Sequence, residues 1–244
     1  MSNLKNHLFA VEAFFKSSVV LAFAVPKEEL EAYIPPCLEL DTYQDKWAFV
    51  ALATVQTTNL RPKGFPSFLG NDFFLIGIRV FVRYKDIKGR SLRGLYILKS
   101  ITNKKKMEFL GNIFTHYNYS TTDIGKFYKG DIRTLYSKKS KFSITINDGA
   151  DEPDLPVGSP FETWKEAKKF SGPLPFTYTY NEKDKSVLII EGVRKNWKPI
   201  PLEIADYEFS FLSDLNITNA VLANAFEVKE VPYYWKKGRL ERWG

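Results

Sequence analysis

The distribution of apolar and polar positions predicts a chain built mainly from β-strands. Residues 47–56 are nearly all apolar, which is typical of a buried strand. Residues 73–84 predict a longer strand in which Arg79, Phe81 and Arg83 share one face. A polar turn around Gly89 leads into residues 92–101, so these two strands are expected to form a hairpin. Similar patterns predict further strands at residues 126–136, 141–147, 176–180, 187–193 and 207–212.

Helix signals occur in three places between the predicted strands. Residues 25–35 combine a proline suited to the first helical position with two glutamates in the first turn. Residues 104–114 carry apolar side chains at intervals of three and four. Ser159, Pro160 and Glu162 match a capping box, which predicts a helix up to about residue 170. Without repeats or a linker, the chain is expected to form one domain over residues 1–244, mainly β with α+β character.

The amino-acid composition favours a β fold and excludes several kinds of functional site. Aromatic residues make up 16% of the 244 residues, and aromatic side chains favour strands. Cys37 is the single cysteine, so no disulfide forms within the chain. Together with His7 and His116 it is too little for a Cys/His zinc cluster, and we expect no metal and no cofactor. The phosphate-binding loop, the dinucleotide-binding glycine triplet and the nucleophile elbow are all missing from the sequence.

The net charge of +7 arises from the middle of the chain. Residues 79–141 hold 16 basic and four acidic residues, whereas the remainder holds 19 basic and 24 acidic residues. Such a block attracts nucleic acid, a membrane surface or an anionic ligand, or it forms a solvated lysine-rich face. No nucleic-acid-binding motif accompanies it, so specific nucleic-acid binding is not expected.

No apolar run approaches the about 18 residues that span a bilayer. Residues 19–25 are the strongest candidate for a secretion signal, but Glu12 and Lys16 precede them and the pattern of such a signal is incomplete. We therefore expect a cytoplasmic protein with no membrane partner.

Residues 115–120 hold the densest cluster of polar and aromatic side chains. The sequence Thr-His-Tyr-Asn-Tyr-Ser offers several groups that orient or protonate a ligand. The alternative is a helix-to-strand connection whose aromatic rings pack and whose polar ends face water. Loops at the ends of elements host functional sites more often than other segments, which keeps the cluster a candidate.

Six short motifs occur in a fixed order along most of the chain. They are the segment 26–41, which ends in Pro-Pro-Cys-Leu-Glu-Leu-Asp, and then Trp47-Ala-Phe-Val, Arg61-Pro-Lys-Gly-Phe-Pro, Ile78-Arg-Val-Phe-Val, Gly158-Ser-Pro-Phe-Glu and Trp197-Lys-Pro-Ile-Pro. This set resembles an uncharacterised bacterial domain-of-unknown-function family related to acetoacetate decarboxylase. The resemblance implies an acetoacetate-decarboxylase-like antiparallel barrel or cone, with three or four peripheral helices around an internal pocket.

The same resemblance places different residues where the decarboxylases carry their chemistry. There, a lysine forms a Schiff base with a β-keto acid, and a neighbouring lysine lowers its pKa. The motif falls on residues 115–118, with His116 at a proline, Tyr117 at the Schiff-base lysine and Asn118 at the second lysine. A pocket glutamate falls near Leu75. Neither Tyr117 nor Asn118 is a primary amine, so imine chemistry is not expected, and whether the chain is an enzyme stays open.

These observations predict a protein that binds, or acts on, a small anionic organic molecule. The positive charge would come from Arg79 and Arg83 if their shared face lies inside the barrel, since buried charges require a partner. If that face lies outside, both arginines are solvated. The expected ligand-binding residues are Arg61, Arg79, Arg83, His116, Tyr117 and Tyr119.

An alternative function is a basic surface-binding protein with no catalytic role. The lysines at positions 104–106, 138, 139 and 141 would then contact nucleic acid or another anionic surface. Homo-oligomer formation is possible under either hypothesis.

Overall fold

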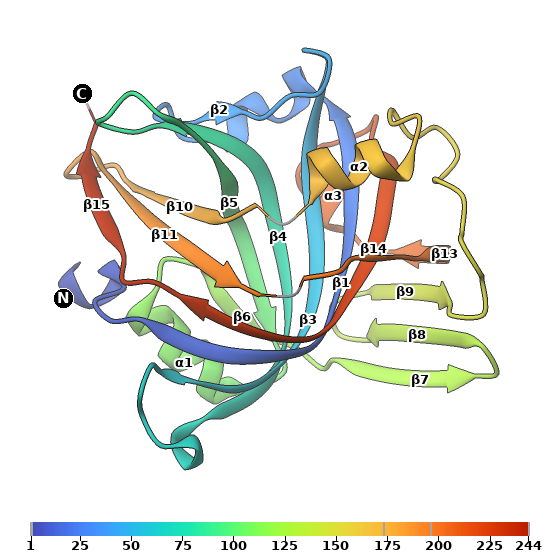
Figure 1. The fold of residues 1–244 in the computed structure, drawn as a ribbon, viewed down its shortest axis with the longest axis horizontal. Coiled ribbons are helices and arrows are strands. Elements are labelled where there is room, and N and C mark those ends of the chain that lie inside the picture. Colours follow the sequence, from blue (N-terminus) through green and yellow to red (C-terminus); the bar gives the residue numbers. More distant parts are fainter. Residues whose placement is uncertain (1, 173, 196, 244) are drawn as a thin grey trace.

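The fold is built around one large, strongly curved sheet (Figure 1). The computed structural model describes residues 2–172, 174–195 and 197–243. Along the sheet the strands follow the order β12-β14-β1-β3-β4-β5-β10-β11-β15, with β2 beside β4 and β6 beside β5. The strands of this sheet are β1 (Val11–Pro26), β2 (Glu39–Leu40), β3 (Trp47–Pro62), β4 (Asn71–Lys85), β5 (Ser91–Thr102), β6 (Tyr119–Thr121), β10 (Phe176–Asn181), β11 (Ser186–Arg194), β12 (Ile200–Pro201), β14 (Val221–Trp235) and β15 (Arg239–Arg242).

The curvature brings distant strands of this sheet together. Most neighbours are antiparallel, while β5 pairs in parallel with both β6 and β10. In addition, three residues of β11 pair with the end of β14, opposite Trp235, Tyr234 and Tyr233. The sheet therefore wraps around an interior space, which matches the expected cone. The expectation of a mainly β fold is confirmed.

A second, smaller sheet packs on the outer face of the large one. Its strands are β7 (Gly125–Lys129), β8 (Ile132–Ser137), β9 (Phe142–Asn147) and β13 (Glu203–Glu208), in the order β13-β9-β8-β7. Apolar side chains of β9, such as Ile144 and Ile146, belong to the same buried cluster as Phe23 and Val50 of the large sheet. The outer face of β1 and β3 is thus a conventional hydrophobic core between two sheets.

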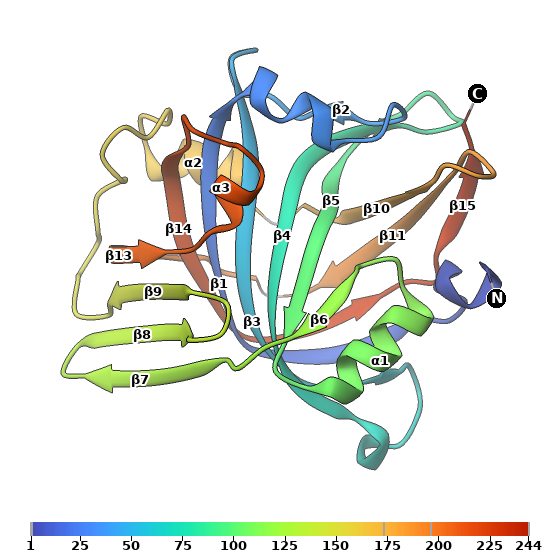
Figure 2. The same cartoon turned by 180° about the vertical axis from the view of Figure 1, so that it is seen from behind.

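The helices flank the large sheet on both of its faces. Among the described residues they are α1 (Lys105–Phe114), α2 (Trp164–Ser171) and α3 (Phe211–Asp214), together with four short 3-10 turns. Figures 1 and 2 show α2 and the small sheet on opposite sides of the large sheet. The α2 region packs on the inner face, where Phe161 and Ala167 join a cluster with Phe49 and Phe81. No described helix is long and apolar enough to cross a membrane.

The structure corrects several element predictions. Residues 25–35 form two 3-10 turns, Lys27–Glu29 and Glu31–Tyr33, rather than one helix. Residues 126–136 are two strands that turn at Gly130, whose φ of 58° suits glycine. Residues 207–212 contain the end of β13 and the start of α3.

The predicted capping box at Ser159 is also wrong. Helix α2 begins at Trp164, and its cap is Thr163, whose side chain accepts a hydrogen bond from the backbone of Glu166. The hydroxyl of Ser159 instead donates to the carbonyl of Ala223 in β14.

Candidate functional site

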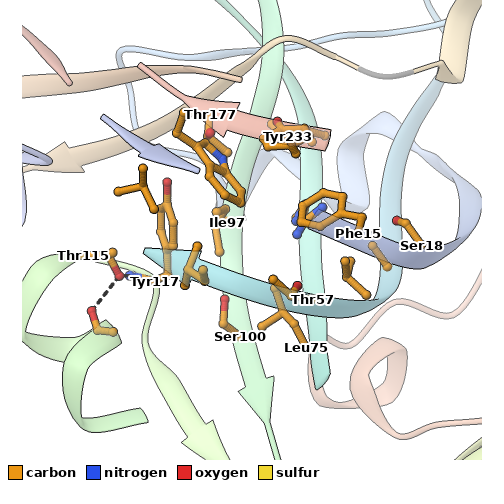
Figure 3. A pocket seen from close by; sticks show the side chains of 18 of the residues that line it. Phe15, Ser18, Thr57, Leu75, Ile97, Ser100, Thr115, Tyr117, Thr177 and Tyr233 are labelled. Carbon is orange, nitrogen blue, oxygen red and sulfur yellow. Dashed lines mark hydrogen bonds between the residues drawn. The ribbon is translucent and has the colours of Figure 1, made fainter. Parts of the chain in front are cut away.

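The interior of the large sheet holds a cavity of about 440 Å³. This volume lies within the usual range for small-molecule sites. Most of the wall is apolar and comes from the inner faces of the strands, from α1 and from residues 4–11. Figure 3 shows Phe15 and Leu75 on one side, with Tyr117 and Tyr233 projecting into the same space from other elements.

Arg79 is the central charged residue of this cavity. It projects from β4 on the same face as Phe81, which also lines the cavity. Its Nε is buried without a hydrogen-bond partner, and no described carboxylate lies within ion-pair distance. The side chain lies back over Gly77, where an added Cβ would approach Nη2 to 2.9 Å. Burial lowers the pKa of the Arg79 guanidinium, but arginine remains protonated in proteins.

A second arginine, Arg194, reaches the cavity from the end of β11. Its Nη2 donates to the carbonyl of Leu174 at 2.8 Å, and the guanidinium lies 5.3 Å from the ring centre of Tyr233. Burial lowers the pKa of Arg194, and the nearby charge of Arg79 lowers it further. The two arginines therefore reinforce each other's positive potential.

Acidic side chains do not balance these charges. Among the described residues that line the cavity, none is an aspartate, a glutamate or a lysine. Arg61 also lines the cavity, but it forms an ion pair with Glu12 at 2.7 Å and donates to the carbonyls of Asn59 and Phe65. The free positive charge of the cavity thus comes from Arg79 and Arg194. A buried charge without a partner is unfavourable, so the site is electrostatically suited to an anion.

The connection between α1 and β6 positions two tyrosines in the wall. Asn112 of α1 holds the backbone of Tyr119 through both its N–H and its carbonyl, each at 2.8 Å. The Tyr119 ring rests on Gly111, where a side chain would collide with it. Thr115 accepts a hydrogen bond from the backbone N–H of Tyr117, and Figure 3 shows the Tyr117 ring standing in the cavity.

These tyrosines act as neutral hydrogen-bonding groups. Burial raises the pKa of Tyr117 to about 12, although Thr177 and Arg79 oppose the shift. Burial also raises the pKa values of Tyr119 and Tyr233. At neutral pH all three carry a hydroxyl proton and are hydrogen-bond donors.

His7 is a further polar group of the wall. Its Nε2 is buried without a partner, and burial lowers the pKa of the imidazole to about 4. The ring is therefore neutral at physiological pH. Its backbone carbonyl accepts a hydrogen bond from Gly238, which fixes this segment beside the last strand.

The structure separates the six expected ligand-binding residues into two groups. Arg61, Arg79, Tyr117 and Tyr119 line the cavity. Neither Arg83 nor His116 belongs to its described wall, contrary to expectation. Arg83 does share a face with Arg79, but it lies beyond Phe81, where it pairs with the fully buried Asp41 at 2.7 Å.

Sequence reasoning missed Arg194 and Tyr233 because both lie near ends of segments that it treated separately. The two residues are cross-strand partners in the contact between β11 and β14. The available signal was an arginine at the end of a predicted strand, three residues before Trp197. In the described residues, no group of three or more His, Cys, Asp or Glu side chains is arranged to hold a metal ion.

Comparisons with known proteins agree with this architecture. Residues 13–241 match the family DUF2071, described as "Uncharacterized conserved protein (COG2071)". No curated protein sequence matches the chain. Among solved structures, acetoacetate decarboxylase from Legionella pneumophila is similar, with a TM-score of 0.59, 13% identity, and coverage of 96% of this chain and 88% of that one.

Two further structures share the fold. An acetoacetate decarboxylase-like enzyme from Sphingomonas wittichii has a TM-score of 0.61 at 7% identity, covering 98% of this chain and 94% of that one. The enduracididine biosynthesis enzyme MppR has a TM-score of 0.56 at 10% identity, covering 96% and 88%. At these identities the likeness concerns the fold alone.

Proposed function

We propose that this chain, which belongs to the DUF2071 family, binds a small organic anion, a carboxylate with an apolar body, in the cavity beside Arg79. The observation that carries the proposal is the guanidinium of Arg79, whose Nε is buried without a hydrogen-bond partner and which lines the cavity without a described carboxylate partner. A carboxylate accepts two parallel hydrogen bonds from a guanidinium and supplies the missing counter-charge.

The remainder of the cavity supports an apolar body for this ligand. Phe15, Phe73, Ile97 and Phe114 present hydrocarbon surface around the charged centre. Burial of the ligand's apolar part adds affinity of about 25 cal/mol per Å² of surface removed from water. The hydroxyl of Tyr117 is available to orient the carboxylate or a neighbouring oxygen.

A comparison of carboxylates with their uncharged amides tests the proposal. Each acid and its primary amide have the same shape, so only the charge differs. Because a ligand that binds the native state alone stabilises it by mass action, carboxylates are expected to raise the melting temperature and amides are not. Equal stabilisation by both members of each pair, or by amides only, would show that the cavity selects apolar shape rather than negative charge.

The proposed function excludes decarboxylation through an imine. An imine requires a primary amine, and no lysine occurs in the described cavity wall. Incubation with acetoacetate followed by borohydride is therefore expected to leave the intact mass of the protein unchanged. An acetoacetate decarboxylase treated in parallel serves as the positive control. A single stoichiometric adduct on any lysine of this chain would contradict the prediction.

A further inference from the structure

A second cavity of about 320 Å³ adjoins the first one. Gly172, Trp197 and Phe226 line both cavities, so these three residues form the boundary between them. The other walls of the second cavity come from α2 and from the segment around β12. The guanidinium of Arg194 lies 5.8 Å from the Trp197 ring, which places the charged part of the first cavity next to this boundary.

Asn224, in the wall of this second cavity, has a side-chain amide donor without a partner. Its side chain is buried, with 1% of the residue exposed. The Oδ1 atom accepts a hydrogen bond from Ser171 at 3.0 Å, whereas Nδ2 has no partner. A buried donor without an acceptor destabilises a protein, so the arrangement favours a ligand that supplies an acceptor oxygen.

The charges around Asn224 indicate the kind of acceptor. Lys165 and Lys168 of α2 line the same cavity and are exposed to solvent at its rim. No described acidic residue occurs in this wall, and neither lysine forms an ion pair with a described residue. An amide donor beside two ammonium groups is suited to an anionic oxygen, as in a carboxylate.

Strand register relates Asn224 to Arg79. Asn224 lies opposite Ala22, Ala22 opposite Ala51, and Ala51 opposite Arg79. Directly opposed residues of antiparallel strands project from the same face of the sheet. The four residues therefore form one row across the strands, with Asn224 and Arg79 at its ends and the two alanines between them. Three strand spacings separate them, about 14 Å along the sheet. An extended aliphatic ligand spans a separation of this order.

We propose that the second cavity is a subsite for the distal carboxylate of a dicarboxylate, whose other carboxylate binds at Arg79. The proposal rests on the function proposed above and adds a substrate class to it. The aliphatic body would pass the boundary formed by Trp197 and Phe226. The distal carboxylate would accept a hydrogen bond from Nδ2 of Asn224, and the lysines at the rim would supply the counter-charge.

Calorimetric titration with matched pairs of ligands tests this subsite. Linear dicarboxylates from glutarate to sebacate are compared with monocarboxylates of the same length. At the length that fits, the dicarboxylate is expected to bind about tenfold more tightly. Asn224→Leu removes the buried amide and should abolish this difference while the affinity for the monocarboxylate stays the same.

Neutralising single lysines of α2 provides a matched control. Lys168→Gln should reduce the preference for the dicarboxylate, whereas Lys169→Gln, which changes the same charge outside the cavity wall, should leave it unchanged. The side-chain amide resonance of Asn224, assigned by its loss in Asn224→Leu, should shift with the dicarboxylate and not with the monocarboxylate. These lysine variants keep the test decisive if Asn224→Leu fails to fold.

Two results would overturn the proposal, and they have different meanings. If monocarboxylates bind and no dicarboxylate binds more tightly, the subsite is refuted and the proposed carboxylate-binding function stands. If no carboxylate of either series binds, both the proposed function and the subsite are refuted.

Discussion

Replacement of Arg79 by methionine is expected to abolish the stabilisation of the protein by carboxylates. A charge-assisted hydrogen bond contributes about 1.5–3 kcal/mol, and the guanidinium can form two of them with one carboxylate. Loss of even one at the upper end of this range weakens binding by about 100-fold. Methionine retains much of the bulk of the side chain and removes an unpaired buried charge. The variant without ligand should therefore melt no lower than the wild type, as measured by thermal denaturation.

Arg83→Met is the matched control for this experiment. Arg83 lies on the same strand and the same face, but it pairs with Asp41, whose side chain is fully buried. The control variant should lose stability and keep the full response to carboxylates. If Arg79→Met also keeps that response, or if both variants lose it equally, Arg79 is not the binding group.

Arg133→Met is expected to cause a large loss of global stability, about 3–5 kcal/mol. Arg133 of β8 forms two hydrogen bonds with Glu227 of β14, at 2.9 and 2.8 Å, and thereby joins the small sheet to the large one. Glu227 is 1% exposed, so removal of the arginine leaves a buried carboxylate without its main partner. Equilibrium unfolding in urea measures the change in the free energy of unfolding.

The double variant Arg133→Met, Glu227→Leu separates the cost of an unpaired charge from the loss of the pair. Replacement of a buried ion pair by apolar residues is often neutral, so the double variant should be more stable than Arg133→Met alone. Asp148→Asn removes the partly exposed acid that Arg133 also contacts, and it should cost at most about 1 kcal/mol. A double variant no more stable than Arg133→Met would contradict this explanation.

The same pair determines part of the response of stability to acid. Burial raises the pKa of Glu227, but the hydrogen bonds from Arg133 and Ser17 outweigh burial, and the net shift is downward. A carboxyl whose pKa is lower in the folded state stabilises the protein above its unfolded pKa. That contribution is lost as the pH falls through the folded value. The stability of Arg133→Met should consequently depend less on pH in the acid range.

The sequence predicted those elements whose pattern is regular. The strands that became β3, β4 and β5 alternate or are continuously apolar over their buried lengths, and helix α1 was expected within one residue of its observed start. The motifs between positions 26 and 201 also indicated the fold. Arg79 became a candidate because the period of a strand placed it with Phe81 on one face.

The two strands that complete the cavity were missed because their alternation is interrupted. In β14, the even-numbered Phe226 and Val228 line the cavity, but so do the odd-numbered Val231 and Tyr233. In a regular strand, even- and odd-numbered residues would face opposite sides of the sheet. Glu230, with a φ of 53°, introduces the shift between them. A comparable irregularity occurs in β1 between Phe15 and Ser17. Such a bulge moves the following side chains to the other face of the sheet, so a strict alternation of apolar and polar residues does not continue across it. The sequence pattern therefore predicts neither of these two strands.

The contact between β11 and β14 has a consequence for the passage of molecules into the interior. Three residue pairs make this contact, and Arg194 and Tyr233, which both line the cavity, form one of them. Gly192, which pairs with Trp235, has to be a glycine because the hydroxyl of Tyr233 occupies the position of a side chain there. So short a junction separates at a lower free energy than the long pairings of β1 with its neighbours. We therefore expect this junction, rather than the long strand pairings, to separate when small molecules enter or leave the interior.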